Sequence, residues 1–197
     1  MKPTNKSSRI AVIGYSFYLL VEMAIYPLIT KVPPLLPTIL NVIYIASFIA
    51  VAAWIMSHDK NLKKPATFII IAAVLSIINK VVIYYHFHVN HIESSIIYSL
   101  VTSSFYIPAL IFKCMGFFKL SKKLPQGNTA RYMANIIPWT ELTPLIISSV
   151  FTIAMLFTTI PNMVLRLPNT IMFLAEILAM AIFCYYLPKA IEHKEEL

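Results

Sequence analysis

The chain has 197 residues, of which 59% are hydrophobic and 12% are charged, and its formal net charge is +8. Soluble domains usually carry about 25% charged residues, so this composition excludes an ordinary soluble domain and indicates a membrane protein. The positive charge does not indicate nucleic-acid binding, because that requires a folded basic surface or a stacking platform, and the basic loops are too short to supply one.

Six segments are long and apolar enough to cross a bilayer, which takes ~20 mostly apolar residues. Short connections make consecutive helices antiparallel neighbours. We therefore predict an all-α integral membrane protein, a six-transmembrane-helix bundle of three antiparallel hairpins that forms a single transmembrane domain over residues 1–197. With only 3 glycines, we expect the helices to pack mostly through Ala, Ser, Thr and interlocking Ile and Leu. The expected spans are 10–29, 36–57, 66–89, 94–118, 133–160 and 168–188.

The basic residues predict the orientation of these spans. Cytoplasmic loops of membrane proteins carry an excess of Lys and Arg. When the N-terminus is placed in the cytoplasm, 13 of the 16 basic residues fall in inner segments, whereas Lys31 and Arg166 fall on outer turns and Lys80 within a span. We therefore expect both termini in the cytoplasm and a location in the plasma (cytoplasmic) membrane; the many Ile, Lys and Asn residues favour a bacterial inner membrane. The inner basic residues are Lys2, Lys6, Arg9, Lys60, Lys63, Lys64, Lys113, Lys119, Lys122, Lys123, Arg131, Lys189 and Lys194.

Three ionisable residues lie well inside the expected spans: Glu22, Lys80 and Glu176. They lie about 12 to 14 residues from the cytoplasmic span ends, which corresponds to roughly 18 to 21 Å at ~1.5 Å per residue. Unpaired charges at such depth are costly, so pairing is the economical arrangement. We predict a polar site near the middle of the membrane that contains these residues and Asn79. It either pins helix packing or binds a solute, ion or proton.

A second polar group lies at the outer end of the third span, where His86, His88, His91 and Glu93 follow one another closely. Imidazole and carboxylate groups are good ligands for zinc and other transition metals. On one helix, however, His88 and His91 share a face that His86 and Glu93 do not, so a metal site would require a turn in this segment. The alternative is a polar cap at the membrane surface.

The cytoplasmic side of the fifth span carries Trp139 and Glu141 near the predicted inner interface. Tryptophan is enriched at membrane surfaces, and a carboxylate is favoured in the first turns of a helix. We expect a structural role for Glu141. The basic inner loops determine topology, and they are also candidate sites for anionic lipid headgroups.

Catalytic signatures are absent from the sequence, which has no G-x-S-x-G, H-E-x-x-H, phosphate-binding or dinucleotide-binding motif. Our leading interpretation is a permease-like or ligand-binding membrane protein that handles a small solute, ion or proton at the mid-membrane polar site. The alternative is a non-catalytic accessory, assembly or immunity-type protein with a protein partner or a homo-oligomeric state. A third interpretation is a membrane enzyme that acts on a lipid through Glu141.

Overall fold

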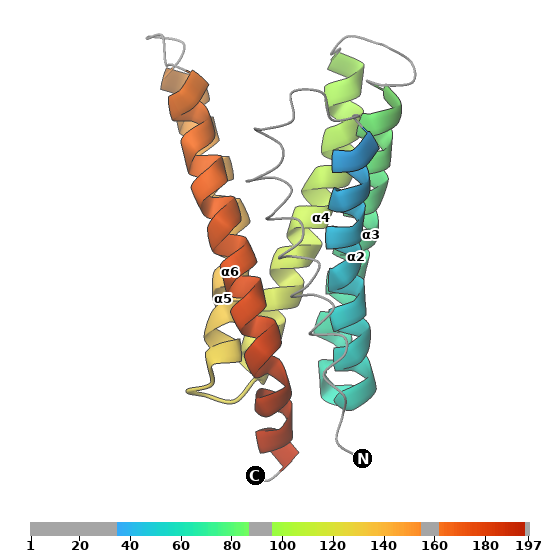
Figure 1. The fold of residues 1–197 in the computed structure, drawn as a ribbon, viewed down its shortest axis with the longest axis vertical. Helices are drawn as coiled ribbons and strands as arrows, with labels where there is room; N and C mark the ends of the chain where they lie inside the picture. Colours follow the sequence, from blue (N-terminus) through green and yellow to red (C-terminus); the bar gives the residue numbers. More distant parts are fainter. Residues whose placement is uncertain (1–34, 87–95, 155–161, 196–197) are drawn as a thin grey trace. The chain divides into compact units, whose positions relative to one another are not determined.

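The computed structural model describes residues 35–86, 96–154 and 162–195. Within this part of the chain the regular structure is entirely helical, with five α-helices, one short 3-10 helix and no strand (Figure 1). The chain divides into two compact units, residues 1–120 and 121–197. The elements are α2 (Leu35–His58), η2 (Lys60–Leu62), α3 (Lys63–Tyr84), α4 (Ile96–Lys123), α5 (Thr129–Ala154) and α6 (Asn162–Glu195).

The all-helical prediction is confirmed for the described residues, and three helical segments are long and apolar enough to cross a membrane. These segments are Asn41–His58, Lys60–Tyr84 and Leu100–Lys123. The expected span 10–29 lies outside the described residues. It remains a prediction that the chain has six spans, that it forms a single domain and that both termini lie in the cytoplasm.

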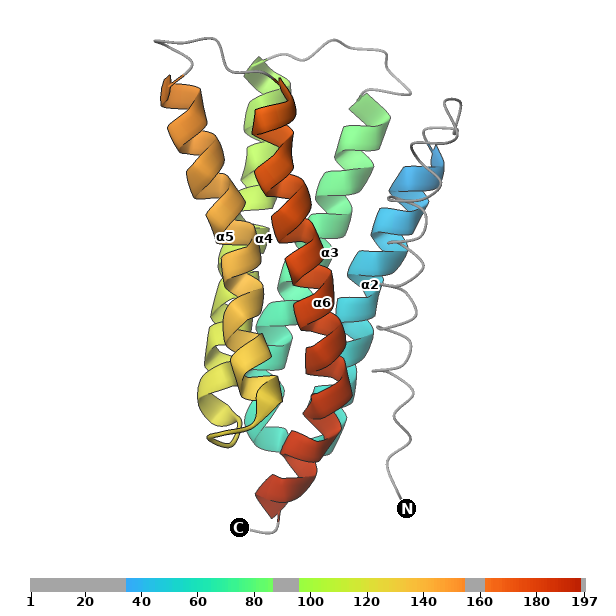
Figure 2. The same ribbon diagram turned by 60° about the vertical axis from the view of Figure 1, so that its left-hand side comes forward.

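In the unit of residues 1–120, α2 and α3 form a helical hairpin and pack along each other (Figure 2). A tight turn at η2 joins them. The Asp59 side chain caps this turn, since its Oδ1 accepts a hydrogen bond from the backbone N–H of Asn61 at 2.7 Å. Leu62 is fully buried beneath the turn. A short polar turn with an apolar anchor thus makes the two helices antiparallel neighbours.

Helix α4 packs against α3 at Gly116. A β-carbon placed on Gly116 would lie 2.7 Å from Cγ1 of Ile69 and 3.1 Å from both the backbone nitrogen of Ile69 and the carbonyl oxygen of Pro65. The two backbones can therefore approach this closely only because residue 116 has no side chain. This contact uses one of the chain's 3 glycines, beside packing that we expect to rest mostly on Ala, Ser, Thr, Ile and Leu.

Aromatic contacts extend the packing of α4 to both neighbouring helices. The Phe112 ring lies 5.9 Å from the Phe68 ring of α3, and the Phe117 ring lies 6.3 Å from the Phe48 ring of α2 in an edge-to-face arrangement. Phe117 is fully buried. Edge-to-face aromatic pairs add about 0.5–1.5 kcal/mol beyond their buried area. These rings therefore contribute to holding α2, α3 and α4 in one unit.

In the unit of residues 121–197, α5 and α6 pack along each other. The buried residues of each helix recur at intervals of three or four, the pattern of a single helical face. They include Ala130, Ala134 and Ile137 on α5, and Met180, Phe183, Cys184 and Leu187 on α6. Pro138 and Pro144 lie inside α5, as neighbouring groups permit in membrane helices.

The loop that leads from α4 into α5 is organised by its own side chains. The Oδ1 atom of Asn128 accepts a hydrogen bond from the N–H of Ala130 at 2.8 Å and so caps the start of α5. The Arg131 guanidinium donates to the carbonyl oxygen of Leu124 at 3.3 Å, just beyond the end of α4. Asn128 and Arg131 therefore satisfy backbone groups that helix ends leave unpaired.

Substituting Gly127 with alanine is expected to destabilise this loop by about 1 kcal/mol, because residue 127 has φ +79° and left-handed backbone is unfavourable for residues with a β-carbon. Nothing lies within 4 Å of the position that the β-carbon would occupy, so the cost is conformational and not steric. Thermal unfolding in detergent measures the effect. Gly127→Asn is the control, since asparagine tolerates this backbone, and an equal loss for both substitutions would contradict the explanation.

Candidate functional site

The predicted charge cluster is distributed over both units of the chain. Lys80 is half-buried on α3 in the unit of residues 1–120. Glu176 lies on α6 in the unit of residues 121–197 and is buried. Glu22 lies outside the described residues. The association of these three charges therefore remains a prediction, and the site is built here from the α2–α3–α4 unit.

Asn79 occupies the buried face of α3, where every other fully buried residue is apolar. The buried residues of this face recur along the helix as Ala66, Ile69, Ala72 and Ala73, and Asn79 continues the series. Its side chain is 7% exposed, and its Oδ1 atom is buried without a hydrogen-bond partner among the residues that the structure describes. Because buried polar atoms are nearly always paired, this unpaired acceptor marks a place where a donor from outside the unit can bind.

Helical register places further polar residues at the level of Asn79. Helices α3 and α4 are antiparallel and touch where Gly116 lies beside Pro65 and Ile69. Each residue advances a helix by about 1.5 Å, so residues equally far from this contact on the two helices lie at the same level. Asn79 is about as far from the contact along α3 as the Thr102–Ser104 segment is along α4. Likewise, Asn41 is about as far from the η2 turn along α2 as Asn79 is along α3, so Asn41 lies at this level too. We call the residues Asn41, Asn79, Lys80, Thr102, Ser103 and Ser104 the polar layer.

The polar layer lies toward the ends of the helices that are remote from the η2 turn. Lys80 is four residues before Tyr84, the last residue of α3, and α3 begins at Lys63, three residues earlier than the predicted span. The longer helix places Lys80 about 5 Å further from the η2 end than predicted. The candidate spans Asn41–His58 and Leu100–Lys123 also begin at this level. The layer therefore lies toward one end of these apolar segments and not at their centre.

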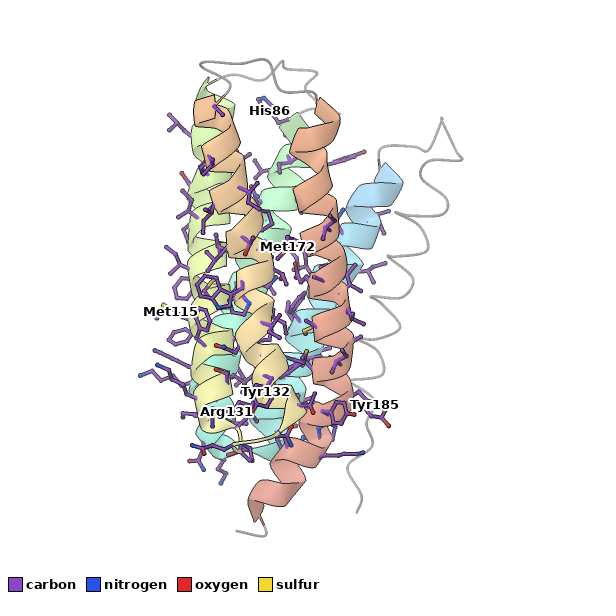
Figure 3. The ribbon with its side chains drawn as sticks, turned by 90° about the vertical axis from the view of Figure 1, so that its left-hand side faces the viewer. His86, Met115, Arg131, Tyr132, Met172 and Tyr185 are labelled. Atoms are coloured by element: carbon purple, nitrogen blue, oxygen red, sulfur yellow. The ribbon has the colours of Figure 1, made fainter. Side chains whose placement is uncertain are left out.

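Of the four predicted metal ligands, only His86 belongs to the described residues. It is half-buried, just beyond Tyr84 at the end of α3 (Figure 3). His88, His91 and Glu93 lie outside the described part of the chain. Within residues 35–86, 96–154 and 162–195, no three His, Cys, Asp or Glu side chains gather in a way that could hold a metal ion. A zinc site in this segment remains a prediction.

Trp139 and Glu141 lie well inside α5 and not in its first turns. The helix begins at Thr129 and continues through Pro138, because Asn128 caps it and the prolines are accommodated within it. The expectation that Glu141 interacts with the N-terminal end of a helix dipole was therefore wrong. Trp139 is 50% exposed, which fits contact with lipid, and Glu141 is half-buried.

Sequence reasoning assigned Lys113 to an inner segment, but the structure places it inside α4, ten residues before the helix ends at Lys123. Its side chain is half-buried, and its ammonium lies 4.9 Å from the centre of the Phe48 ring. A cation over an aromatic face gains about 0.5–2 kcal/mol, more where water is excluded. Lys113 is thus a second lysine within an apolar helix. The sequence already indicated this, because residue 113 lies inside the predicted span 94–118.

Comparisons with protein-family models, curated proteins and solved structures give no match for this chain. The geometry of the chain's own residues is therefore the basis for its functional assignment.

Proposed function

We propose that this protein is a small permease-like or ligand-binding membrane protein that holds a small polar solute at the polar layer. The observation that supports this proposal best is the buried, unpaired Oδ1 atom of Asn79. A buried acceptor without a donor costs about 1–3 kcal/mol. A ligand that donates an N–H or O–H to this oxygen would offset it.

The chemistry of the layer indicates the class of solute. The Asn79 oxygen accepts a hydrogen bond, and the neighbouring Lys80 ammonium favours a negative group. Intramembrane lysines usually face a protein interior or a water-filled cavity and mark pathways for substrates and ions. The half-buried Thr102 adds a hydroxyl at the same level, whereas the exposed Ser104 already donates its hydroxyl to the carbonyl oxygen of Leu100 at 2.7 Å. An amino acid or a hydroxycarboxylate carries both required groups within a few ångströms, so these solutes are the best candidates.

We further propose that the chain crosses the cytoplasmic membrane six times with both termini in the cytoplasm. The three helices of suitable length and composition support a membrane location. The basic residues of the sequence support the orientation, since Lys and Arg concentrate on one side when all six spans alternate. This topology places the η2 turn in the cytoplasm and the polar layer toward the outer surface, where a solute enters from outside.

The proposal predicts that one or more amino acids or hydroxycarboxylates at millimolar concentration raise the unfolding temperature of the purified protein. A ligand that binds only the folded state stabilises it by about 3 kcal/mol at a concentration 100 times Kd. We expect Asn79→Leu to abolish this shift and Lys80→Met to weaken it. Counterflow of the same radiolabelled solute into proteoliposomes then distinguishes a permease from a receptor.

Lys189→Met is the matched control for Lys80→Met, since Lys189 is an exposed lysine of α6. It should leave the ligand-dependent shift unchanged. If no probe stabilises the wild type, or if the shift survives in both Asn79→Leu and Lys80→Met, the polar layer is not a solute site. The interpretation as a non-catalytic accessory protein, in which buried polar groups only join the helices, would then replace it.

A further inference from the structure

Four lysines of the α2–α3–α4 unit gather at the end opposite to the polar layer. Lys60, Lys63 and Lys64 lie on η2 and the first turn of α3, and all three are exposed. Lys119 comes from α4, and its ammonium lies 4.5 Å from the centre of the Phe68 ring. Phe68 is one helical turn after Lys64, so the Lys119 charge lies close to the α3 lysines. We call these four residues the lysine surface.

Among the described residues around the η2 turn, positive charges outnumber negative ones. The nearest carboxylate in the sequence is that of Asp59, and its Oδ1 atom already accepts a hydrogen bond from the turn that it caps. Four lysines are therefore accompanied in this part of the sequence by one carboxylate. Because like charges held together repel, a surface of this kind is stabilised by a bound anion.

The position of the lysine surface identifies the anion. All three candidate membrane segments have one of their two ends there. The segments Asn41–His58 and Leu100–Lys123 reach it with their last residue, and Lys60–Tyr84 with its first. The ends of apolar spans lie at the level of the phospholipid headgroups. Lysine stems can remain against apolar surface while their ammonium groups reach the headgroups, and the Lys119 ammonium lies over the Phe68 ring at this end of the helices. Phosphate groups of lipids are thus the anions at this depth.

We propose that the lysine surface is a binding site for the headgroup of an anionic phospholipid in the cytoplasmic leaflet. Exposed Lys63 and Lys64 approach the lipid phosphate from α3, while Lys119 is held by Phe68 and approaches it from α4. The close contact at Gly116 holds the two helices in the register that brings these charges together. This inference is independent of the proposed solute site, because it concerns the other end of the same three helices.

Native mass spectrometry of the protein in micelles that contain equal amounts of phosphatidylglycerol and phosphatidylcholine tests the proposal. We expect the wild type to retain phosphatidylglycerol in preference to phosphatidylcholine, and Lys63→Gln with Lys64→Gln to reduce that preference by about tenfold. The control, Lys189→Gln with Lys194→Gln, removes the same charge from the unit of residues 121–197 and should keep the preference.

Two measurements keep the result interpretable. The unfolding temperature in phosphatidylcholine alone should be equal for the wild type and both double variants, because the substituted lysines of the surface are exposed. Inorganic phosphate at about 10 mM, well below the physiological ionic strength of about 0.15 M, should not displace the bound lipid. Equal retention of the two lipids by the wild type, or an equal loss of preference in the control, would overturn the proposal. Displacement by phosphate would show a site for the free ion instead.

Discussion

Gly116→Val is expected to destabilise the protein by about 3 kcal/mol or more, and Gly116→Ala by about 1–3 kcal/mol. Alanine favours a helix over glycine by about 1 kcal/mol, so a purely local effect would have the opposite sign. The steric cost is larger because the new β-carbon would lie 3.1 Å from two backbone atoms of α3, which cannot move without shifting the helix. Thermal unfolding in detergent measures both variants.

A double-mutant cycle with Ile69→Ala separates the two parts of this clash. Truncating Ile69 removes the Cγ1 atom that would lie 2.7 Å from the new β-carbon, but leaves the backbone nitrogen of residue 69 and the carbonyl of Pro65 in place. We therefore expect only partial rescue of Gly116→Ala, seen as a coupling energy of about 0.5–3 kcal/mol. Ala53→Val, at an exposed site on α2, is the control for added volume. A Gly116→Ala protein as stable as the wild type would contradict the close approach of the helices.

Asn79→Leu is expected to raise the stability of the protein by about 1–3 kcal/mol while it abolishes the response to solute. Leucine has the branching of asparagine with methyl groups in place of the amide oxygen and nitrogen, so the buried oxygen that lacks a partner disappears without leaving a cavity. A gain in stability together with a loss of binding indicates a residue that is kept for function at a cost to the fold. Chemical or thermal unfolding without added solute gives the first quantity.

Ser47→Ala is the matched control for this substitution. Ser47 is buried on α2 in the same unit, but its hydroxyl donates to the carbonyl oxygen of Tyr44 at 2.6 Å. Removing a polar group that already has its hydrogen bond should leave stability unchanged or lower it by up to about 1 kcal/mol. If Asn79→Leu destabilises the protein as well, Asn79 is held by a partner in the membrane and its role is structural.

The sequence predicted the helices more accurately than their lengths or contacts. The span 36–57 agrees closely with α2, because apolar residues fill the helix and a polar turn with Asp59 ends it. By contrast, α6 extends from Asn162 to Glu195, well beyond the predicted 168–188. Hydropathy marks the part of a helix that suits a lipid environment, whereas the backbone continues as helix into polar sequence.

The candidate site was only partly predictable for a related reason. Lys80 and Asn79 were recognisable as polar residues within an apolar segment, and the structure adds that Asn79 continues the buried face of α3. The level of the Thr102–Ser104 segment relative to them depends on the contact between Gly116 and α3. Such a contact arises from the shapes of two helices that are distant in sequence, and no local pattern reports it.

The burial of Cys184 gives this protein an intrinsic probe of its own unfolding. The side chain is 1% exposed on α6, so a thiol-reactive fluorophore cannot reach it while α5 and α6 remain packed. Cys114 is the other cysteine of the chain, and replacing it with alanine leaves a single reactive sulfur in the unit of residues 121–197. The converse variant leaves only Cys114, which is half-buried on α4 and serves as the reference for a thiol that is partly accessible in the folded protein. The labelling rate of Cys184 relative to this reference would therefore report the opening of its own unit, without any attached tag.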